Sequence, residues 1–155
     1  MKSSPPNKNL ISLRSKPFVV SKTKLSKTFT IQVRKNPEKP GRSIKDVWDI
    51  RKPLLKDFEN NYSYIVTLRG KGNIAGNHYH KNKQELIFPI MGNFTVLLEN
   101  IESKEREVIS LEVTKHQVIY FPSGIAHAIR AETDRAIFLV IATSAEGDVV
   151  QYKIL

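Results

Sequence analysis

Short apolar runs separated by polar turns fill the chain from about Asp46 onward, and hardly any helical period interrupts them. Within residues 62–68, aromatic and aliphatic side chains fall on every second position, so they share one face of a predicted strand. Residues 93–99 and 108–113 alternate in the same way. Further strands are predicted at residues 84–90, 117–122, 126–131, 136–142 and 148–154.

The turns between these runs contain glycine, proline and asparagine, as at residues 92–93 and 122–124. Many short strands at this spacing are typical of a β-sandwich or β-barrel, and a double-sheet jelly roll removes most exposed strand edges. We therefore predict an all-β domain over residues 46–155, with the architecture of a double-stranded β-helix barrel.

Residues 44–58 are the one stretch that could hold a short helix. Because proline disrupts the interior of a helix, Pro53 would end that helix at the turn after Arg51. We expect this segment to pack as a flap over the barrel, with Trp48 as an anchor in the core.

The first 45 residues differ in composition from the rest of the chain. They hold 12 of the 25 lysine and arginine residues but one of the 15 acidic residues, so residues 46–155 are close to neutral. Five of the eight prolines also lie here, which predicts a basic, partly disordered leader over residues 1–45. The alternating "SKTFTIQV" stretch predicts one edge strand within it. The leader is either a solvated tail or an arm that binds nucleic acid or an anionic lipid surface.

A chain of 155 residues with 40% hydrophobic residues is expected to form one folded domain. No stretch approaches the roughly 18 consecutive apolar residues of a membrane span, and the N-terminus lacks the apolar region of a secretory signal. The absence of cysteine excludes disulfides and thiolate metal ligands and suits a cytoplasmic location. Any metal would therefore be held by nitrogen and oxygen atoms.

Three of the four histidines lie in two short motifs. In "GNHYHKNKQE", His78 and His80 are two positions apart, so they point to the same face of a strand. Glu85 follows after a segment long enough to turn the chain, and His127 in "FPSGIAHAI" comes just after a proline/glycine turn. The fourth histidine, His116, is expected at an exposed turn.

If the four side chains of these motifs face an apolar interior, each costs on the order of 2–7 kcal/mol unless it is partnered. A divalent cation would partner three neutral imidazoles and one carboxylate, a set that suits Zn, Fe, Mn, Ni or Cu. An exposed His-x-His turn or a hydrogen-bonded core histidine is the alternative for each residue alone. The predicted metal ligands are His78, His80, Glu85 and His127.

Taken together, these residues resemble the two-part motif of the cupin superfamily. The fixed positions of the first motif are all present as Gly72, His78, His80, Glu85 and Gly92. Three positions of the second motif are present as Pro122, Gly124 and His127, whereas His116 and Ala131 replace its glycine and asparagine. The resemblance implies a jelly-roll barrel in which the matching residues usually bind a divalent metal. It also implies a homodimer, because cupins commonly pair through N-terminal strands.

The stretch "GNHYHKNKQELIFPIMGNFTVLLEN" is similar to a narrower group, the sugar-nucleotide cupins of polysaccharide assembly. These include dTDP-4-dehydrorhamnose 3,5-epimerase-like and dTDP-sugar 3,4-ketoisomerase-like proteins, and the cupin half of capsule-biosynthesis enzymes that act on UDP-sugars. The resemblance implies an isomerase or epimerase of a nucleotide-linked keto-sugar, working by proton transfer next to a carbonyl without an organic cofactor. Relatives in this group often work without a metal, so its presence stays open.

Carried over to this chain, the resemblance makes His80 the candidate base, with His78 holding or sharing the proton. Tyr64 is either the candidate acid or an aromatic that lines the barrel. Many relatives have an arginine just before Gly-x-His that can bind the diphosphate, but Ala75 stands there. The candidates for that charge are Arg69, Lys71, Arg130 and Lys81.

Two other classes of function fit the same residues. A metal-dependent cupin enzyme could oxygenate or isomerise a small keto acid or carboxylate through open metal positions. A binding module could recognise a sugar or metabolite without turnover, with the basic leader docking a partner.

Overall fold

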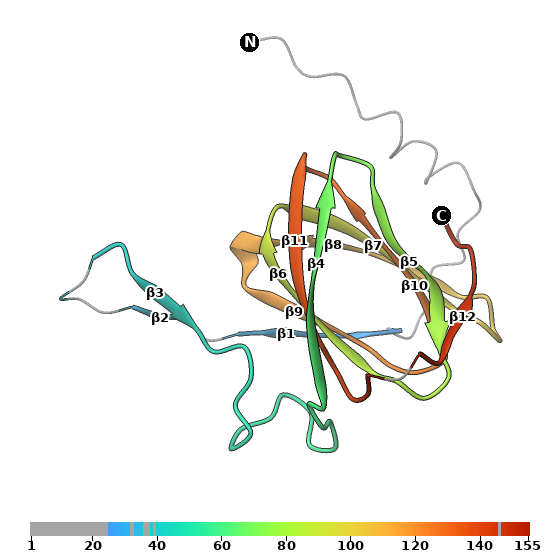
Figure 1. The fold of residues 1–155 in the computed structure, drawn as a ribbon, viewed down its shortest axis with the longest axis horizontal. Helices are drawn as coiled ribbons and strands as arrows, with labels where there is room; N and C mark the ends of the chain where they lie inside the picture. Colours follow the sequence, from blue (N-terminus) through green and yellow to red (C-terminus); the bar gives the residue numbers. More distant parts are fainter. Residues whose placement is uncertain (1–24, 32, 36–37, 39, 146) are drawn as a thin grey trace, which may run out of the picture.

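Two five-stranded antiparallel sheets form the barrel of the computed structural model (Figure 1). The structure describes residues 25–31, 33–35, 38, 40–145 and 147–155. The first sheet, in the order β1-β9-β6-β11-β4, consists of β1 (Lys27–Thr30), β4 (Tyr62–Arg69), β6 (Glu85–Met91), β9 (Gln117–Phe121) and β11 (Arg135–Ala142). The second, in the order β12-β5-β10-β7-β8, consists of β5 (Ile74–His80), β7 (Asn93–Asn100), β8 (Arg106–Glu112), β10 (Ile125–Ala131) and β12 (Val149–Gln151).

Two smaller elements complete the described part of the chain. The strands β2 (Val33–Lys35) and β3 (Ser43–Lys45) pair only with each other, and this hairpin projects from the barrel (Figure 1). A single turn of 3₁₀ helix, η1 (Val113–Lys115), lies between β8 and β9. Among the described residues, no helix is long and apolar enough to cross a membrane.

The core lies between the two sheets and is built from inward-facing alternate residues. On β7, Phe94, Val96 and Leu98 are at most 1% exposed, and they share one cluster with Phe138 and Val140 of β11. Each such side chain contributes roughly 1.5–3 kcal/mol when it is removed from water. The predicted all-β jelly roll is confirmed, because the strand periods that predict it are the ones that fill this core.

The segment between β3 and β4 contains turns and no helix, so the possible short helix before Pro53 does not form. Local hydrogen bonds take its place: the Asp49 carboxylate accepts the Arg51 amide at 2.9 Å, and the Asp49 carbonyl accepts the Lys52 amide at 2.9 Å. A short polar side chain that bonds nearby amides offers the backbone an alternative to the helix.

The same segment nevertheless covers the outer face of the first sheet, as the sequence predicts. Trp48 packs against Phe58 with ring centroids 5.5 Å apart, and both join a cluster with Phe88 and Ile141. This second apolar layer fixes β6 and β11 from outside.

The edge strand predicted in the leader is present as β1, which pairs with β9 of the same chain. Phe29 and Ile31 pack into the outer apolar layer. The leader also contains β2 and β3, which were not predicted from the sequence. Residues 1–24, 32, 36–37 and 39 of the leader lie outside the described residues, and the division of the chain after residue 45 stays a prediction. The homodimer also stays a prediction.

Candidate functional site

The four predicted metal ligands come together between the two sheets. His78 and His80 lie on β5, Glu85 is the first residue of β6, and His127 lies on β10 directly opposite His78. One nitrogen of each histidine ring lies within 4.8 Å of the other two. The sequence alternation therefore places both β5 histidines on the inner face, and the β5–β10 pairing adds the third.

Glu85 lies against two of the three histidines. Its Oε1 atom is 3.5 Å from Nε2 of His80, and its Oε2 atom is 3.6 Å from Nε2 of His127. The hydroxyl of Tyr64 donates a hydrogen bond of 2.9 Å to Oε1. Glu85, His80 and His127 are each at most 4% exposed, and we call these three the buried trio.

Asp148 holds the His80 ring from behind. One carboxylate oxygen lies 2.9 Å from Nδ1 of His80, and the other accepts the backbone amides of Asn82 and Lys83 at 2.6 and 2.9 Å. An ionised carboxylate can only accept, so the proton of a neutral His80 ring lies on Nδ1 and its Nε2 is an acceptor.

Sequence reasoning missed Asp148. The residue precedes β12, and the pairing of β12 with β5 brings it beside His80, 68 positions away. The Gly147-Asp148 turn is visible in the sequence, but it carries no signal of a partner for His80.

Ionisation at the site favours charged carboxylates and neutral rings at His78 and His127. Desolvation opposes the charge on Glu85, yet contacts with His80, His127 and Tyr64 lower its pKa to about 2. Burial lowers the pKa of His127 to about 4, and burial and the neighbouring His80 lower the pKa of His78. Burial and Glu85 raise the pKa of Tyr64 well above its ordinary value, so this hydroxyl keeps its proton.

Asp148 is ionised as well. Desolvation opposes its charge, but hydrogen bonds from the Asn82 and Lys83 amides and from His80 lower its pKa to about 2. The cluster therefore combines two carboxylates with neutral rings at His78 and His127, and it attracts a positive charge.

A cavity of about 170 Å³ opens onto one side of the cluster. Polar groups enter its wall from Tyr64, His78, Glu85 and His127, and the remainder of the wall is Val66, Ala75, Gly76, Ile87, Ile129, Phe138 and Val140. His80 does not line this cavity, and its Nε2 is buried. His78 and Tyr64 are half-buried, so they are the most accessible polar groups of the site.

The residues fit a divalent cation. Nε2 of His80 is buried and has no hydrogen-bond partner among the described residues, and the nearest Glu85 oxygen, itself an acceptor, is too far away for a hydrogen bond. Such an arrangement of lone pairs favours a positive charge between them. The carboxylate that holds Nδ1 of His80 matches the usual support of a metal-binding histidine.

The four residues predicted to supply charge for a diphosphate lie outside the cavity wall. Arg69 ends β4 and Lys71 lies in the following turn, and both are exposed and absent from the cavity wall. Arg130 points to the outer face of β10, where its guanidinium binds Glu132 at 2.7–2.8 Å. The structure does not bring Arg130 to the histidine cluster. Lys81 is exposed in the turn after β5.

His116 lies apart from the other histidines. It caps η1 in a left-handed conformation with φ of 51°, and its carbonyl accepts the Ile31 amide at 2.9 Å. The residue is partly exposed and has the structural position that the sequence predicts.

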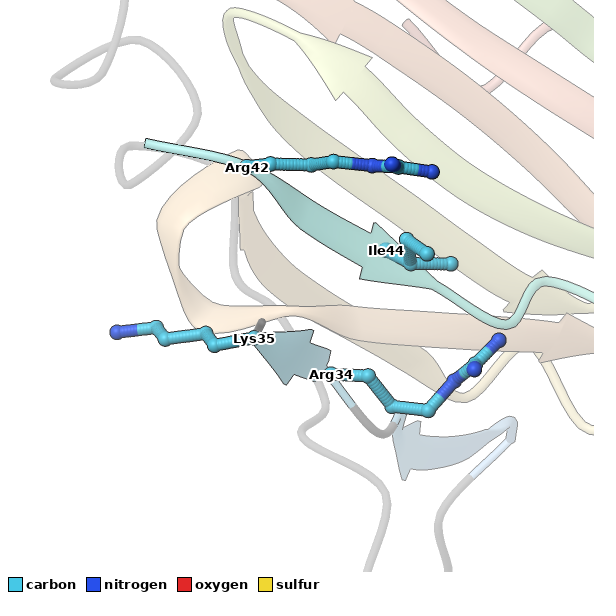
Figure 2. Close-up of a pocket in the computed structure, with 4 residues that line it drawn as sticks. All are labelled: Arg34, Lys35, Arg42 and Ile44. Atoms are coloured by element: carbon cyan, nitrogen blue, oxygen red, sulfur yellow. The ribbon is translucent and has the colours of Figure 1, made fainter. Parts of the chain in front are cut away.

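A larger hollow of about 290 Å³ lies on the β2–β3 hairpin. Figure 2 shows Arg34, Arg42 and Ile44 along one side of this hairpin, with Lys35 pointing away. Arg34 is bound to Asp46 through contacts of 2.7 and 2.9 Å. The hollow contains no acid–base pair or metal-ligand set, so the histidine cavity is the candidate active site. Binding of nucleic acid or an anionic surface through the leader stays a prediction.

Acid is expected to destabilise the metal-free protein in a defined pH window. The pKa of His127 is about 4 in the folded chain against 6.5 ordinarily, so the unfolded chain takes up the proton first. The contribution of His127 to the free energy of unfolding is therefore complete above about pH 6.5. It falls by on the order of 3 kcal/mol as the pH drops to about 4. His78 acts in the same direction, and Glu85 and Asp148 extend the loss below about pH 4.5.

Urea unfolding in a chelator across this range measures the loss. His127→Gln should show a flatter profile between about pH 6.5 and 4, because the buried ring that resists protonation is gone. Wild-type protein with equal stability at both ends of the window would contradict a neutral, buried His127.

Comparison with known proteins supports the architecture. The model of the family described as "Polysaccharide biosynthesis C-terminal domain" matches residues 55–147. No curated protein sequence matches the chain.

Solved structures share the fold at low identity. The sugar 3,4-ketoisomerase QdtA from Thermoanaerobacterium thermosaccharolyticum, solved with TDP, has a TM-score of 0.67 and 16% identity over 82% of this chain and 88% of its own. The TDP-quinovose 3,4-ketoisomerase WlaRB from Campylobacter jejuni has a TM-score of 0.70 and 18% identity over 83% and 94%. The 3,5-epimerase RmlC from Legionella pneumophila, solved with dTDP-4-keto-L-rhamnose, has a TM-score of 0.74 and 13% identity over 88% and 77%. These likenesses confirm a cupin-like fold.

Proposed function

Because the chain belongs to the polysaccharide biosynthesis C-terminal domain family, we propose that it isomerises or epimerises a nucleotide-linked keto-sugar. The observation that carries this proposal is the cavity wall, where a neutral histidine and a protonated tyrosine meet beside a buried carboxylate. The names of the solved structures with this fold support the substrate class, since they include 3,4-ketoisomerases and 3,5-epimerases of such sugars.

His78 and Tyr64 are the proton-transfer pair in this proposal. The sequence favours His80 as the base, but the buried Nε2 of His80 lies behind the wall, whereas the ring of His78 lines the cavity. The lowered pKa of His78 leaves its ring neutral and able to accept a proton near neutral pH. The Glu85 and Asp148 carboxylates stabilise the imidazolium that forms.

The reaction needs no oxidant. A base removes the proton from the carbon next to the ketone, the electrons of that C–H bond form a carbon–carbon double bond, and the ketone oxygen takes up a proton to give an enediol. Return of a proton to the former ketone carbon, while the neighbouring oxygen loses its proton, completes isomerisation. Return to the opposite face of the original carbon gives the epimer. Tyr64 keeps its proton at neutral pH, so its hydroxyl can donate to the oxygen that gains negative charge.

The buried trio has a separate role, that of holding a divalent cation. A cation bound by Glu85, His80 and His127 would polarise a substrate oxygen at the cavity. Three protein ligands with an open position are the arrangement found in catalytic zinc sites. Because the cation is assigned to the buried trio, the His78 ring stays free for the substrate, although it is close enough to serve as a fourth ligand.

The nucleotide would extend beyond the cavity, since the wall contains no lysine or arginine. Arg69 and Lys71, on the turn between β4 and β5, remain the proposed partners of the diphosphate. The predicted homodimer belongs to the same proposal.

Turnover of keto-sugar nucleotides tests this function. We expect the protein to convert TDP-4-keto-6-deoxyglucose, or its UDP counterpart, into a 3-keto isomer or an epimer that chromatography and NMR identify. Saturable binding of these compounds without any product would contradict the proposal and favour a binding module. Turnover of small keto acids in their place would favour the metal-dependent enzyme class.

A further inference from the structure

The strand that presents His78 contains a bulge one residue before it. Between β5 and β10, His78 is opposite His127 and Gly76 is opposite Ala128, so Asn77 is an extra residue without a partner. Asn77 has φ of 62°, in the left-handed region. An extra residue of this kind bends a strand and redirects the side chains that follow it.

The bulge changes which side chains face the cavity. Ala75 and His78 both line it, although they are three positions apart and strict alternation would place them on opposite faces. A β-carbon on Gly76 would lie 2.6 Å from the His127 carbonyl oxygen, so the strands approach too closely here for any other residue. The orientation of His78 therefore depends on the backbone at Asn77.

Asn77 is held from the other side by residues 152–155. Its Oδ1 accepts the backbone amides of Ile154 and Leu155 at 3.1 and 3.0 Å. Its backbone carbonyl accepts the Tyr152 amide at 2.9 Å, and its Nδ2 lies 3.4 Å from the Leu155 carbonyl. Ile154 is 6% exposed and packs in an apolar cluster with Leu97, Ala126 and Ala128, which anchors the segment.

We infer that Asn77 is a positioning residue, which fixes the left-handed bulge through residues 152–155 and thereby aims the ring of His78 into the cavity. This inference rests on the proposed role of His78 in proton transfer. It adds a residue outside the cavity wall. Its side-chain amide forms hydrogen bonds with the backbone of residues 154–155 and thereby sets the geometry of His78, the next residue in the chain.

Two substitutions separate conformation from contact. Asn77→Gly tolerates the positive φ but loses the side-chain hydrogen bonds. Asn77→Asp keeps an acceptor oxygen for the Ile154 and Leu155 amides, loses only the long Nδ2 contact with the Leu155 carbonyl, and still favours the left-handed region. Asn100→Gly is the matched control, because Oδ1 of Asn100 also accepts two backbone amides, from Glu102 and Ser103, and its carbonyl accepts one, from Lys104. Asn100 ends β7 in a turn and plays no part in the proposed site.

The first readout is the position of the ring itself. In protein labelled at its four histidines, ring-proton NOEs between His78 and His127 should be strong, since their centroids are 4.7 Å apart. We expect Asn77→Gly to weaken these NOEs and Asn77→Asp to retain them. Signals of His116 should stay unchanged in every variant. Wild-type NOEs in Asn77→Gly would overturn the inference.

The second readout is turnover. We expect kcat for keto-sugar exchange to fall by about tenfold or more in Asn77→Gly, the size of effect that substitution of a supporting residue commonly has. The change in KM should be smaller, and the affinity for Zn²⁺ should stay unchanged. Asn77→Asp should restore kcat, and Asn100→Gly should lower thermal stability without changing kcat. An equal loss of kcat in Asn100→Gly and Asn77→Gly would show that the loss comes from lower stability of the whole fold, and this would overturn the inference. Changed His78 NOEs in a protein that shows no exchange with any keto-sugar would refute the proposed function and leave the positioning by Asn77 in place.

Discussion

Replacing His78 with glutamine is expected to slow proton exchange from a keto-sugar nucleotide by about a thousandfold, the range that a lost general base commonly costs. Glutamine has a similar polar reach but cannot take up a proton. The ring lies on the cavity wall outside the buried trio, so the fold should survive the change. Steady-state exchange in deuterated buffer, with circular dichroism as a check of the fold, measures this effect.

His80→Gln and His116→Gln show whether His78 or His80 is the base. His80→Gln should also lose exchange, but together with Zn²⁺ affinity, because Nε2 of His80 belongs to the proposed cation site. His116→Gln should behave as wild type, since that residue caps η1 away from the cluster. If His78→Gln exchanged at the wild-type rate while metal-loaded His80→Gln did not exchange, the base would be His80, as the sequence favours.

Glu85→Gln is expected to abolish stabilisation by Zn²⁺ while leaving the metal-free fold nearly intact. At Zn²⁺ concentrations about a thousandfold above Kd, binding stabilises a wild-type site by about 4 kcal/mol, which raises Tm by roughly 10 °C for a chain of this size. The Tyr64 hydroxyl should donate to the amide oxygen of the new residue and so direct the amide nitrogen toward Nε2 of His127. The new amide group would then donate a hydrogen bond to the Nε2 lone pair of His127, which the cation needs.

Thermal melts with and without Zn²⁺, after dialysis against a chelator, measure the effect. Glu99→Gln is the matched control, because Glu99 is similarly buried, at 4% exposure against 2% for Glu85, but lies on the outer face of β7 with Arg106 and Tyr152 as partners. It should keep the full response to Zn²⁺. A Zn²⁺ response that persists in Glu85→Gln would exclude Glu85 as a ligand, and a large loss of metal-free stability would indicate that the carboxylate instead balances a protonated histidine.

The strands and the convergence of the histidines could be predicted because both depend on local periodicity. Alternation fixes which residues of β4 and β7 enter the core, and it places His78 and His80 on one face. The same rule bears on Arg130, which is three positions from His127 and therefore points to the opposite face of β10. The sequence already contained the reason to place it outside the site.

Asp148 and Asn77 could not be predicted because they depend on register. The pairing of β12 with β5 brings Asp148 to His80, and the bulge opposite Ala128 gives Asn77 its role. Neither register leaves a local pattern in the sequence. The absence of a helix in residues 44–58 has a similar cause, since apolar side chains packed on the outer sheet and local bonds of Asp49 outweigh the weak helical pattern.

The most direct test of the account is the fate of the hydrogen on carbon 3 of TDP-4-keto-6-deoxyglucose in deuterated water, followed by NMR. The account predicts that the wild-type protein replaces this hydrogen with deuterium and that His78→Gln does so about a thousandfold more slowly. Carbon 3 that keeps its hydrogen in the presence of folded protein, both with Zn²⁺ and after chelation, and with the TDP and UDP sugars alike, would contradict proton transfer at this cavity.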